Sequence, residues 1–270
     1  MNDKIGPGFI LLSFLQSFIP YKKARMAIWE YFLLFFCVLL GGALAFRFHG
    51  KAQNALKLVL SFSGAYLLGI TVLHLMPGAF SIPEASAGLW ILGGFLVQLL
   101  LEQLSQGVEH GHIHVHEHGR SRMAIQVMIG LSLHAFLEGM PLSHYDSFHA
   151  IQHGHAHGHQ HLLLGIVLHK LPAAFALVSL LLLSHFRNQT AWLCLAFFAS
   201  MSPLGALVAG SFNLSPLAMA NLLGFVIGSF LHIATTILFE ADDDRQHHVS
   251  WLKMGVILLG MGLALIADFL

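Results

Sequence analysis

The sequence predicts an all-α membrane protein with eight transmembrane helices. Of its 270 residues, 56% are hydrophobic and only 10% are charged, whereas roughly 25% are charged in soluble domains. Runs of about 20 apolar residues recur along the chain, and each is long enough to cross the hydrocarbon core as a helix. The predicted spans cover residues 27–46, 57–77, 88–105, 123–143, 162–184, 191–210, 216–239 and 251–269.

The connections between these spans are mostly short and polar, which predicts one eight-span domain over residues 27–270. The segment 1–26 ahead of it holds an apolar run at 9–19. This run is too short to cross a bilayer and lacks the clear basic start of a signal peptide. We expect the segment to form a helix in the membrane interface. A processed leader and an upstream start codon ahead of Met26 are the alternatives.

The distribution of basic residues predicts that both chain termini lie outside. The connections after spans one, three, five and seven hold basic residues, whereas those after spans two, four and six hold none. By the positive-inside rule the first group is cytoplasmic. The cluster Lys22, Lys23 and Arg25 ahead of span one disagrees with this orientation. The residues that support it are Arg47, Lys51, Lys57, Arg120, Arg122, Arg187, Arg245 and Lys253.

Spans four and five contain polar side chains that are costly in hydrocarbon. His134 and Glu138 lie four residues apart in span four, and His169 lies in span five. An Asp at the centre of a membrane helix costs about 2.5–3.5 kcal/mol to insert, so such residues indicate function. Positions i and i+4 share one helix face, and the helical rise places His134 about 14 Å and His169 about 11 Å below the outer surface. These ligand types at similar depth predict a site for zinc or a similar divalent metal.

His74 in span two lies closer to the surface. It is either a ligand where the ion enters, a fourth ligand of the site or a hydrogen-bonded core residue. Four prolines fall inside or at the ends of spans two, four, five and six, and each leaves the carbonyl four residues earlier without its helical donor. Such carbonyls can coordinate a cation, although a packed kink explains any single proline. The prolines are Pro77, Pro141, Pro172 and Pro203.

Two connections are rich in histidine. Residues 110–118 belong to the predicted cytoplasmic link after span three, and the predicted external link 144–161 follows span four. Alternating His in Gly-containing segments gathers metal ions through exchangeable imidazole contacts, which predicts capture outside and buffering inside. The alternative is a solvated loop without a specific role. The peripheral ligands are His110, His112, His114, His116, His118, His153, His155, His157, His159 and His161.

Several functional classes are excluded by composition and spacing. The formal net charge is zero with His neutral, which gives no basis for nucleic-acid binding. Cys37 and Cys194 lie in apolar runs and form neither a disulfide framework nor a CxxC motif. An intramembrane metalloprotease requires His-Glu-x-x-His, but Ala135 follows His134 and Glu138 occupies the place of the second His.

The motifs of spans two, four and five, in this order, resemble the ZIP family of zinc- and iron-regulated transporter-like proteins, from Trp29 onward. The run His-Ala-Phe-Leu-Glu-Gly that starts at His134 resembles the family's His-Ser/Asn-x-x-Glu-Gly. The run His-Lys-Leu-Pro-Ala-Ala that starts at His169 resembles its His-Lys-x-Pro-Glu-Gly. Span two, up to His74-Leu-Met-Pro77, and the His-rich loop after span three are also similar to the family's pattern.

This resemblance implies that residues 27–270 form a transporter domain for the uptake of divalent metal, chiefly zinc, into the cytoplasm. It implies a site between spans four and five, a homodimer, and an elevator-like motion in which spans one, four, five and six slide against the others. The metal is the transported substrate, no cofactor is required, and the short loops favour an inner or plasma membrane. Because ligand chemistry does not set direction, a metal exporter and a His-rich membrane metal sensor or buffer are the alternatives.

The chain departs from the two-metal version of the family pattern. Ala173 stands in place of a bridging Glu, and Ala135 stands where Asn is frequent. Lys170 occupies the position of another ligand, and Ser202 in span six replaces a Glu that some members carry. We therefore expect one transport site rather than two.

Three further charged or titratable residues lie inside predicted spans. Lys170 is too deep to reach an interface and needs a partner, for which Glu138 is the nearest choice if spans four and five pack together. The alternative is a Lys170 that is hydrated in the pathway. Glu102 in span three and His232 in span seven are expected to line the pathway or to pack.

Overall fold

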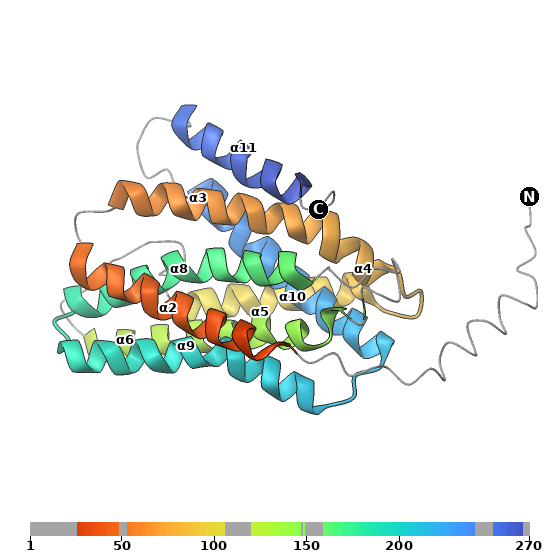
Figure 1. Ribbon diagram of the computed structural model, residues 1–270, viewed down its shortest axis with the longest axis horizontal. Helices are drawn as coiled ribbons and strands as arrows, with labels where there is room; N and C mark the ends of the chain where they lie inside the picture. The colour runs from red at the N-terminus through yellow and green to blue at the C-terminus, as the bar shows by residue number, and fades with distance from the viewer. Residues whose placement is uncertain are drawn as a thin grey trace, which may run out of the picture.

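The computed structural model describes residues 26–48, 53–105, 120–146, 148, 159–240 and 251–266, and these residues form a bundle of helices (Figure 1). Every predicted span coincides with a helical segment whose ends differ from the prediction by a few residues. Helices are expected because hydrocarbon offers no partner for backbone N–H and C=O groups. The long helices are α2 (Ile28–Phe48), α3 (Gln53–Ile70), α5 (Ala87–Ser105), α6 (Arg120–Gly139), α8 (His159–Leu183), α9 (Asn188–Ser211), α10 (Pro216–Glu240) and α11 (Trp251–Ile266).

In the described part of the chain, seven helical segments are long and apolar enough to cross a membrane. They correspond to predicted spans one to seven. The helix of predicted span eight, α11, has 16 residues. At 1.5 Å per residue it is about 24 Å long, whereas the hydrocarbon core is about 30 Å thick. The eighth crossing therefore stays a prediction.

Two of the four prolines coincide with a change of helix type. The π-helical segment η1 (Thr71–Leu75) follows α3, and Pro77 lies in the first turn of the short helix α4 (Met76–Phe80). Pro141 lies in the first turn of the 3₁₀ segment η3 (Met140–Ser143), where α6 ends. Pro172 and Pro203, in contrast, lie inside the continuous helices α8 and α9. The structure thus interrupts spans two and four but not spans five and six.

The helices pack in two groups. Among the described residues, one buried hydrophobic cluster is drawn from α2, α6, α8 and α9 and includes Val38, Leu131, Leu177 and Phe198. In the other group α10 packs on α5 and α3, and α11 packs on α3. Figure 1 shows α11 and α3 along one side of the bundle and α6 with α9 along the opposite side. The two groups meet where α5 contacts α6 and α3 contacts α8, and a second buried cluster joins α2, α8 and α9 to α3, α10 and α11.

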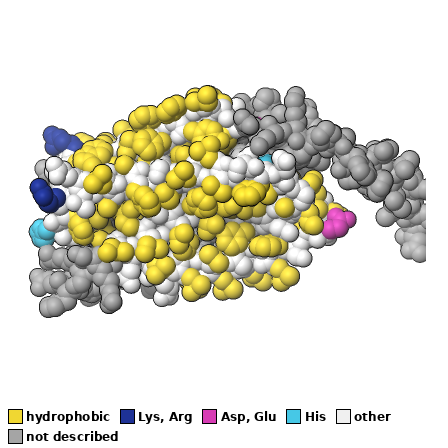
Figure 2. Space-filling model, turned by 90° about the horizontal axis from the view of Figure 1, so that it is seen from below, with side chains coloured by type: hydrophobic (Ala, Val, Ile, Leu, Met, Phe, Trp, Pro, Cys, Tyr) yellow, Lys and Arg dark blue, Asp and Glu magenta, His cyan; other side chains and the backbone are white. Residues whose placement is uncertain are grey.

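The surface of the bundle fits a membrane environment. Figure 2 shows hydrophobic side chains covering the long face, with Lys, Arg and His side chains at one end and acidic side chains at the other. Exposed side chains on this type of surface include Phe32, Leu96, Leu193 and Leu258. Large apolar side chains are exposed at such density only where the surrounding solvent is itself apolar.

Glycine allows α5 and α10 to approach until their backbones touch. A Cβ added to Gly94 of α5 would overlap the backbone carbonyl of Phe225, and one added to Gly228 of α10 would overlap that of Ile91. Small residues at the contact are the usual way in which membrane helices gain close packing, because lipid supplies no hydrophobic drive between them. The helices α5 and α10 are therefore closely packed along this contact.

Gly94→Val should destabilise the protein by about 1–3 kcal/mol, because the added side chain forces the two backbones apart. Gly93→Val is the matched control, since nothing lies within 4 Å of a Cβ at that neighbouring position. The apparent melting temperature of the detergent-solubilised protein measures both. Equal melting temperatures for the two variants would contradict the close contact.

Candidate metal centre

Three buried side chains from neighbouring helices converge inside the bundle. His134 and Glu138 project from α6 and His169 from α8, and one ligand atom of each lies within 4.8 Å of the others. Their exposed fractions are 2%, 1% and 1%. The i, i+4 spacing on α6 brings the first two together, as predicted. Two imidazoles and one carboxylate that face a common point are a ligand set suited to zinc.

Two basic side chains, Lys170 and His134, contact the carboxylate of Glu138. Its Oε1 lies 2.6 Å from Lys170 Nζ, and its Oε2 lies 2.8 Å from His134 Nε2. The Lys170 ammonium also lies 4.9 Å from the centre of the Phe198 ring, a distance at which a ring face attracts a cation. The structure therefore pairs Lys170 with Glu138, as the sequence predicted. The buried carboxylate is compensated within the bundle.

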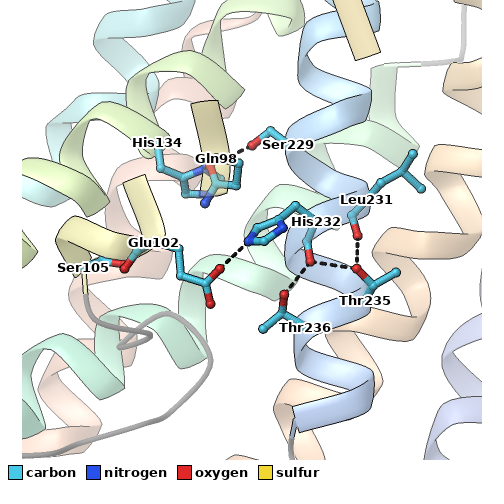
Figure 3. A network of polar contacts seen from close by, with 9 residues as sticks. All are labelled: Gln98, Glu102, Ser105, His134, Ser229, Leu231, His232, Thr235 and Thr236. Carbon is cyan, nitrogen blue, oxygen red and sulfur yellow. Dashed lines mark hydrogen bonds and ion pairs between the residues drawn. The ribbon is translucent and has the colours of Figure 1, made fainter. Parts of the chain in front are cut away.

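Gln98 of α5 links the site to the other helix group. Its Oε1 lies 3.0 Å from His134 Nδ1 and accepts a hydrogen bond of 2.9 Å from Ser229 Oγ of α10 (Figure 3). The exposed fraction of Gln98 is 1%. Sequence reasoning missed Gln98 and Ser229. The available signal was a polar amide in an apolar span, four residues before Glu102 and hence on the same helix face.

The second polar cluster joins Glu102 of α5 to His232 of α10. Glu102 Oε2 and His232 Nε2 form a hydrogen bond, and the Phe95 ring meets His232 edge-on with 4.8 Å between ring centroids. Figure 3 shows this pair beside Gln98 and Ser229, on the same two helices. The sequence predicts that each residue lines the pathway or packs, but it does not show that the two are partners. Only the packing of α5 on α10 brings them together.

His74 lies outside the three-residue cluster. Its Nε2 is 3.2 Å from the carbonyl oxygen of Ala264 in α11, and its ring stacks on His161 with 5.5 Å between centroids. This arrangement fits the hydrogen-bonded core alternative, while a role for His74 where the ion enters stays a prediction. His161 is the one peripheral histidine whose side chain belongs to the described part of the chain. The side chains of the other nine, from His110 to His159, lie outside it.

Ser202 fixes α9 against α6. Its Oγ donates a hydrogen bond of 2.9 Å to the carbonyl oxygen of Ala135, one residue after His134. A Cβ on Gly139 would overlap the Ser202 backbone, so α6 and α9 touch here as well. Ala135 and Ala173 are both buried and supply no ligand atom. Ser202 of α9 thus packs against the turn of α6 that carries His134.

Glu138→Leu should destabilise the protein by about 3–5 kcal/mol, because it leaves the Lys170 ammonium buried without its carboxylate. The double variant Glu138→Leu, Lys170→Leu should recover most of this loss, since removing both partners of a buried pair is frequently neutral or stabilising. Unfolding free energies in mixed micelles provide the measurement. A double variant as unstable as the single one would show that the pair is not the source of the loss.

Comparison with known proteins adds a family assignment to this geometry. A family model described as ZIP Zinc transporter matches residues 105–268, more than half of the chain. The match includes the helices that carry His134, Glu138, His169 and Lys170. A search of curated protein sequences found no match to this chain.

Proposed function

This chain belongs to the ZIP zinc transporter family, and we propose that it carries zinc into the cytoplasm through a site made by His134, Glu138 and His169. Members of the family transport divalent metal across a membrane and are not enzymes, so the metal is the substrate and no cofactor is needed. The observation that carries the proposal is the convergence of these three ligand atoms within 4.8 Å in the interior of an apolar bundle. Exposed acidic clusters are common, but a buried one is costly unless it serves a function.

The ligand set suits an ion that must be released again. Two imidazoles and one carboxylate bind zinc less firmly than the closed four-thiolate sites of structural zinc domains. Lys170 adds a competing cation at 2.6 Å from Glu138. In the proposed mechanism Lys170 neutralises Glu138 until zinc arrives and then yields the carboxylate to the ion. The pathway therefore exchanges one compensating charge for another rather than exposing a bare carboxylate to a low-dielectric interior.

Alternating access is proposed to occur by sliding between the two helix groups. Both ligand-bearing helices, α6 and α8, share a hydrophobic cluster with α2 and α9. These are spans one, four, five and six, the set that the family resemblance expects to move together. In the other group α10 packs on α5 and α3, and α11 packs on α3, although a second buried cluster also joins this group to α2, α8 and α9. A cluster shared by four helices favours their displacement as one body, because close-packed cores do not deform gradually.

The membrane topology, the dimer and the roles of the histidine-rich loops are proposed from the sequence. We place α11 in the membrane as the eighth crossing, both termini outside and residues 27–270 in one domain. The transporter is proposed to act as a homodimer in an inner or plasma membrane. The external histidines of 144–161 would capture metal and those of 110–118 would buffer it in the cytoplasm. Glu102 and His232, paired on α5 and α10, would line the pathway beside the transport site.

Purified protein in liposomes that contain a zinc-sensing dye should admit zinc, and His134→Ala should abolish most of this flux because it removes one of three ligands. His185→Asn is the matched control, since His185 is exposed and has φ of 58°, a backbone conformation that Asn tolerates. Zinc flux that is independent of His134 would contradict the site. Direction follows from cellular zinc after expression: a rise indicates uptake, and a fall indicates export.

Zinc flux should fall with acidification, because protons compete with the metal for the imidazole ligands. In Lys170→Ala this loss should begin at higher pH, since a buried carboxylate without a nearby cation takes up a proton more readily. Initial rates between about pH 5 and 8, the range in which His changes charge, provide the measurement. A profile identical to that of the unaltered protein would remove Lys170 from the mechanism.

A further inference from the structure

We infer that Gln98 is a positioning residue for the metal ligand His134, and that its hydrogen bond makes the zinc affinity of the site depend on the position of α6 relative to α5. This inference rests on the proposed function, because it concerns regulation of the same site. It begins from an asymmetry in the structure. His134 is a ligand on one helix group, whereas the acceptor beside its second ring nitrogen belongs to the other group.

The hydrogen bonds around Gln98 define which nitrogen of His134 is available. Gln98 Oε1 lies 2.9 Å from Ser229 Oγ and 3.0 Å from His134 Nδ1. An amide oxygen only accepts, so Ser229 and His134 Nδ1 both donate to it. The proton of the imidazole is thereby held at Nδ1. Nε2, which contacts Glu138 Oε2 at 2.8 Å, is the nitrogen that would exchange this contact for the ion.

This contact is the kind that tunes a metal ligand. A metal-bound His generally donates its other N–H to a carboxylate, a carbonyl or water, which fixes the ring and raises its basicity. Gln98, Ser229 and His134 are all buried, with exposed fractions of 1%, 6% and 2%. Water therefore competes poorly for these groups, and loss of the acceptor would leave the Nδ1 proton unsatisfied in an apolar interior.

The hydrogen-bond acceptor Gln98 and the proposed ligand His134 belong to different helix groups. Gln98 lies on α5 and Ser229 on α10, two helices whose backbones touch at Gly94 and Gly228. Ser229 therefore keeps the amide oriented on the α5–α10 unit. His134 lies on α6, which shares its hydrophobic cluster with α2, α8 and α9. The hydrogen bond from His134 to Gln98 thus crosses the surface along which the proposed sliding occurs.

Sliding would break this bond before it disturbs the ligand set. N–H···O hydrogen bonds have donor–acceptor distances of about 2.7–3.2 Å, so a displacement of about 1 Å along α5 removes the contact. His134, Glu138 and His169 move together on α6 and α8, but His134 loses its acceptor and becomes a less basic, less firmly oriented ligand. One state then binds zinc tightly and the other binds it weakly, as transport requires. The neutral amide suits this role, since a carboxylate would hold the ring more strongly.

Two substitutions at Gln98 should change the zinc affinity of the site in opposite directions. Gln98→Leu removes the acceptor and should weaken zinc binding and raise KM by 10–100-fold, the range typical for loss of such partners. Gln98→Glu supplies a charged acceptor of the same length and should tighten zinc binding while lowering kcat. A purely structural role predicts losses of the same sign in both variants. Gln103→Glu is the matched control, because Gln103 lies on the same helix and is exposed.

The experiment measures the zinc affinity of the full-length chain in detergent by competition with a chelating dye, and KM and kcat in proteoliposomes. Opposite shifts in affinity support the inference. Unchanged affinity in both variants overturns it, as does a weakening in both. If Gln98→Leu does not fold, the nearly isosteric Gln98→Glu still tests the inference, which requires tighter zinc binding and a lower kcat in this variant. Zinc binding that depends on His134 but not on Gln98 refutes this inference alone, whereas binding independent of His134 refutes the proposed function and this inference with it.

Discussion

A carboxylate buried in an apolar helix bundle must be neutralised by its neighbours, and the arrangement of Glu138 shows how this chain meets that constraint. Glu138 lies 2.6 Å from Lys170 and 2.8 Å from His134, with essentially no exposure of its side chain. Each partner comes from a position that the helix geometry dictates: His134 is one turn away on α6, and Lys170 follows His169 on α8. The charges that hold the carboxylate are thus adjacent to the groups that would share the ion with it. The same few side chains therefore neutralise the buried charge of Glu138 and offer the candidate ligand atoms.

The two helix groups give this polar set its surroundings. Where α5 meets α10 and α6 meets α9, glycine lets backbones touch, and membrane helices gain packing energy in this way because lipid is as apolar as their side chains. The candidate ligands belong to the group with α6 and α9, and the acceptor for His134 belongs to the group with α5 and α10. The polar network that extends from His134 through Gln98 to Ser229, with Glu102 and His232 beside it, therefore crosses the contact between α6 and the pair α5 and α10 (Figure 3).

Much of this organisation was predictable from residue order. Apolar runs located to within a few residues the seven described helical segments that are long enough to cross a membrane, because a helix in lipid must present apolar side chains to its surroundings. The i, i+4 spacing placed His134 beside Glu138, and similar depth brought His169 to the same level. The pairing of Lys170 with Glu138 followed from the cost of an isolated ammonium at that depth. The same reasoning did not predict which of Pro77, Pro141, Pro172 and Pro203 would interrupt a helix, because neighbouring helices can satisfy the carbonyl that a proline frees.

The sequence by itself determined the membrane class, the helix positions and the identity of the three converging candidate ligands, since these follow from local hydropathy, from spacing along one helix and from similar depth. Only the tertiary structure decided which polar groups on separate helices meet. It joined His74 to the Ala264 carbonyl rather than to the metal cluster, paired Glu102 with His232, and set Gln98 between His134 and Ser229. The physical reason is that hydrophobic periodicity specifies which residues face lipid, whereas the rotation and depth of one helix against another depend on side-chain packing over the whole contact.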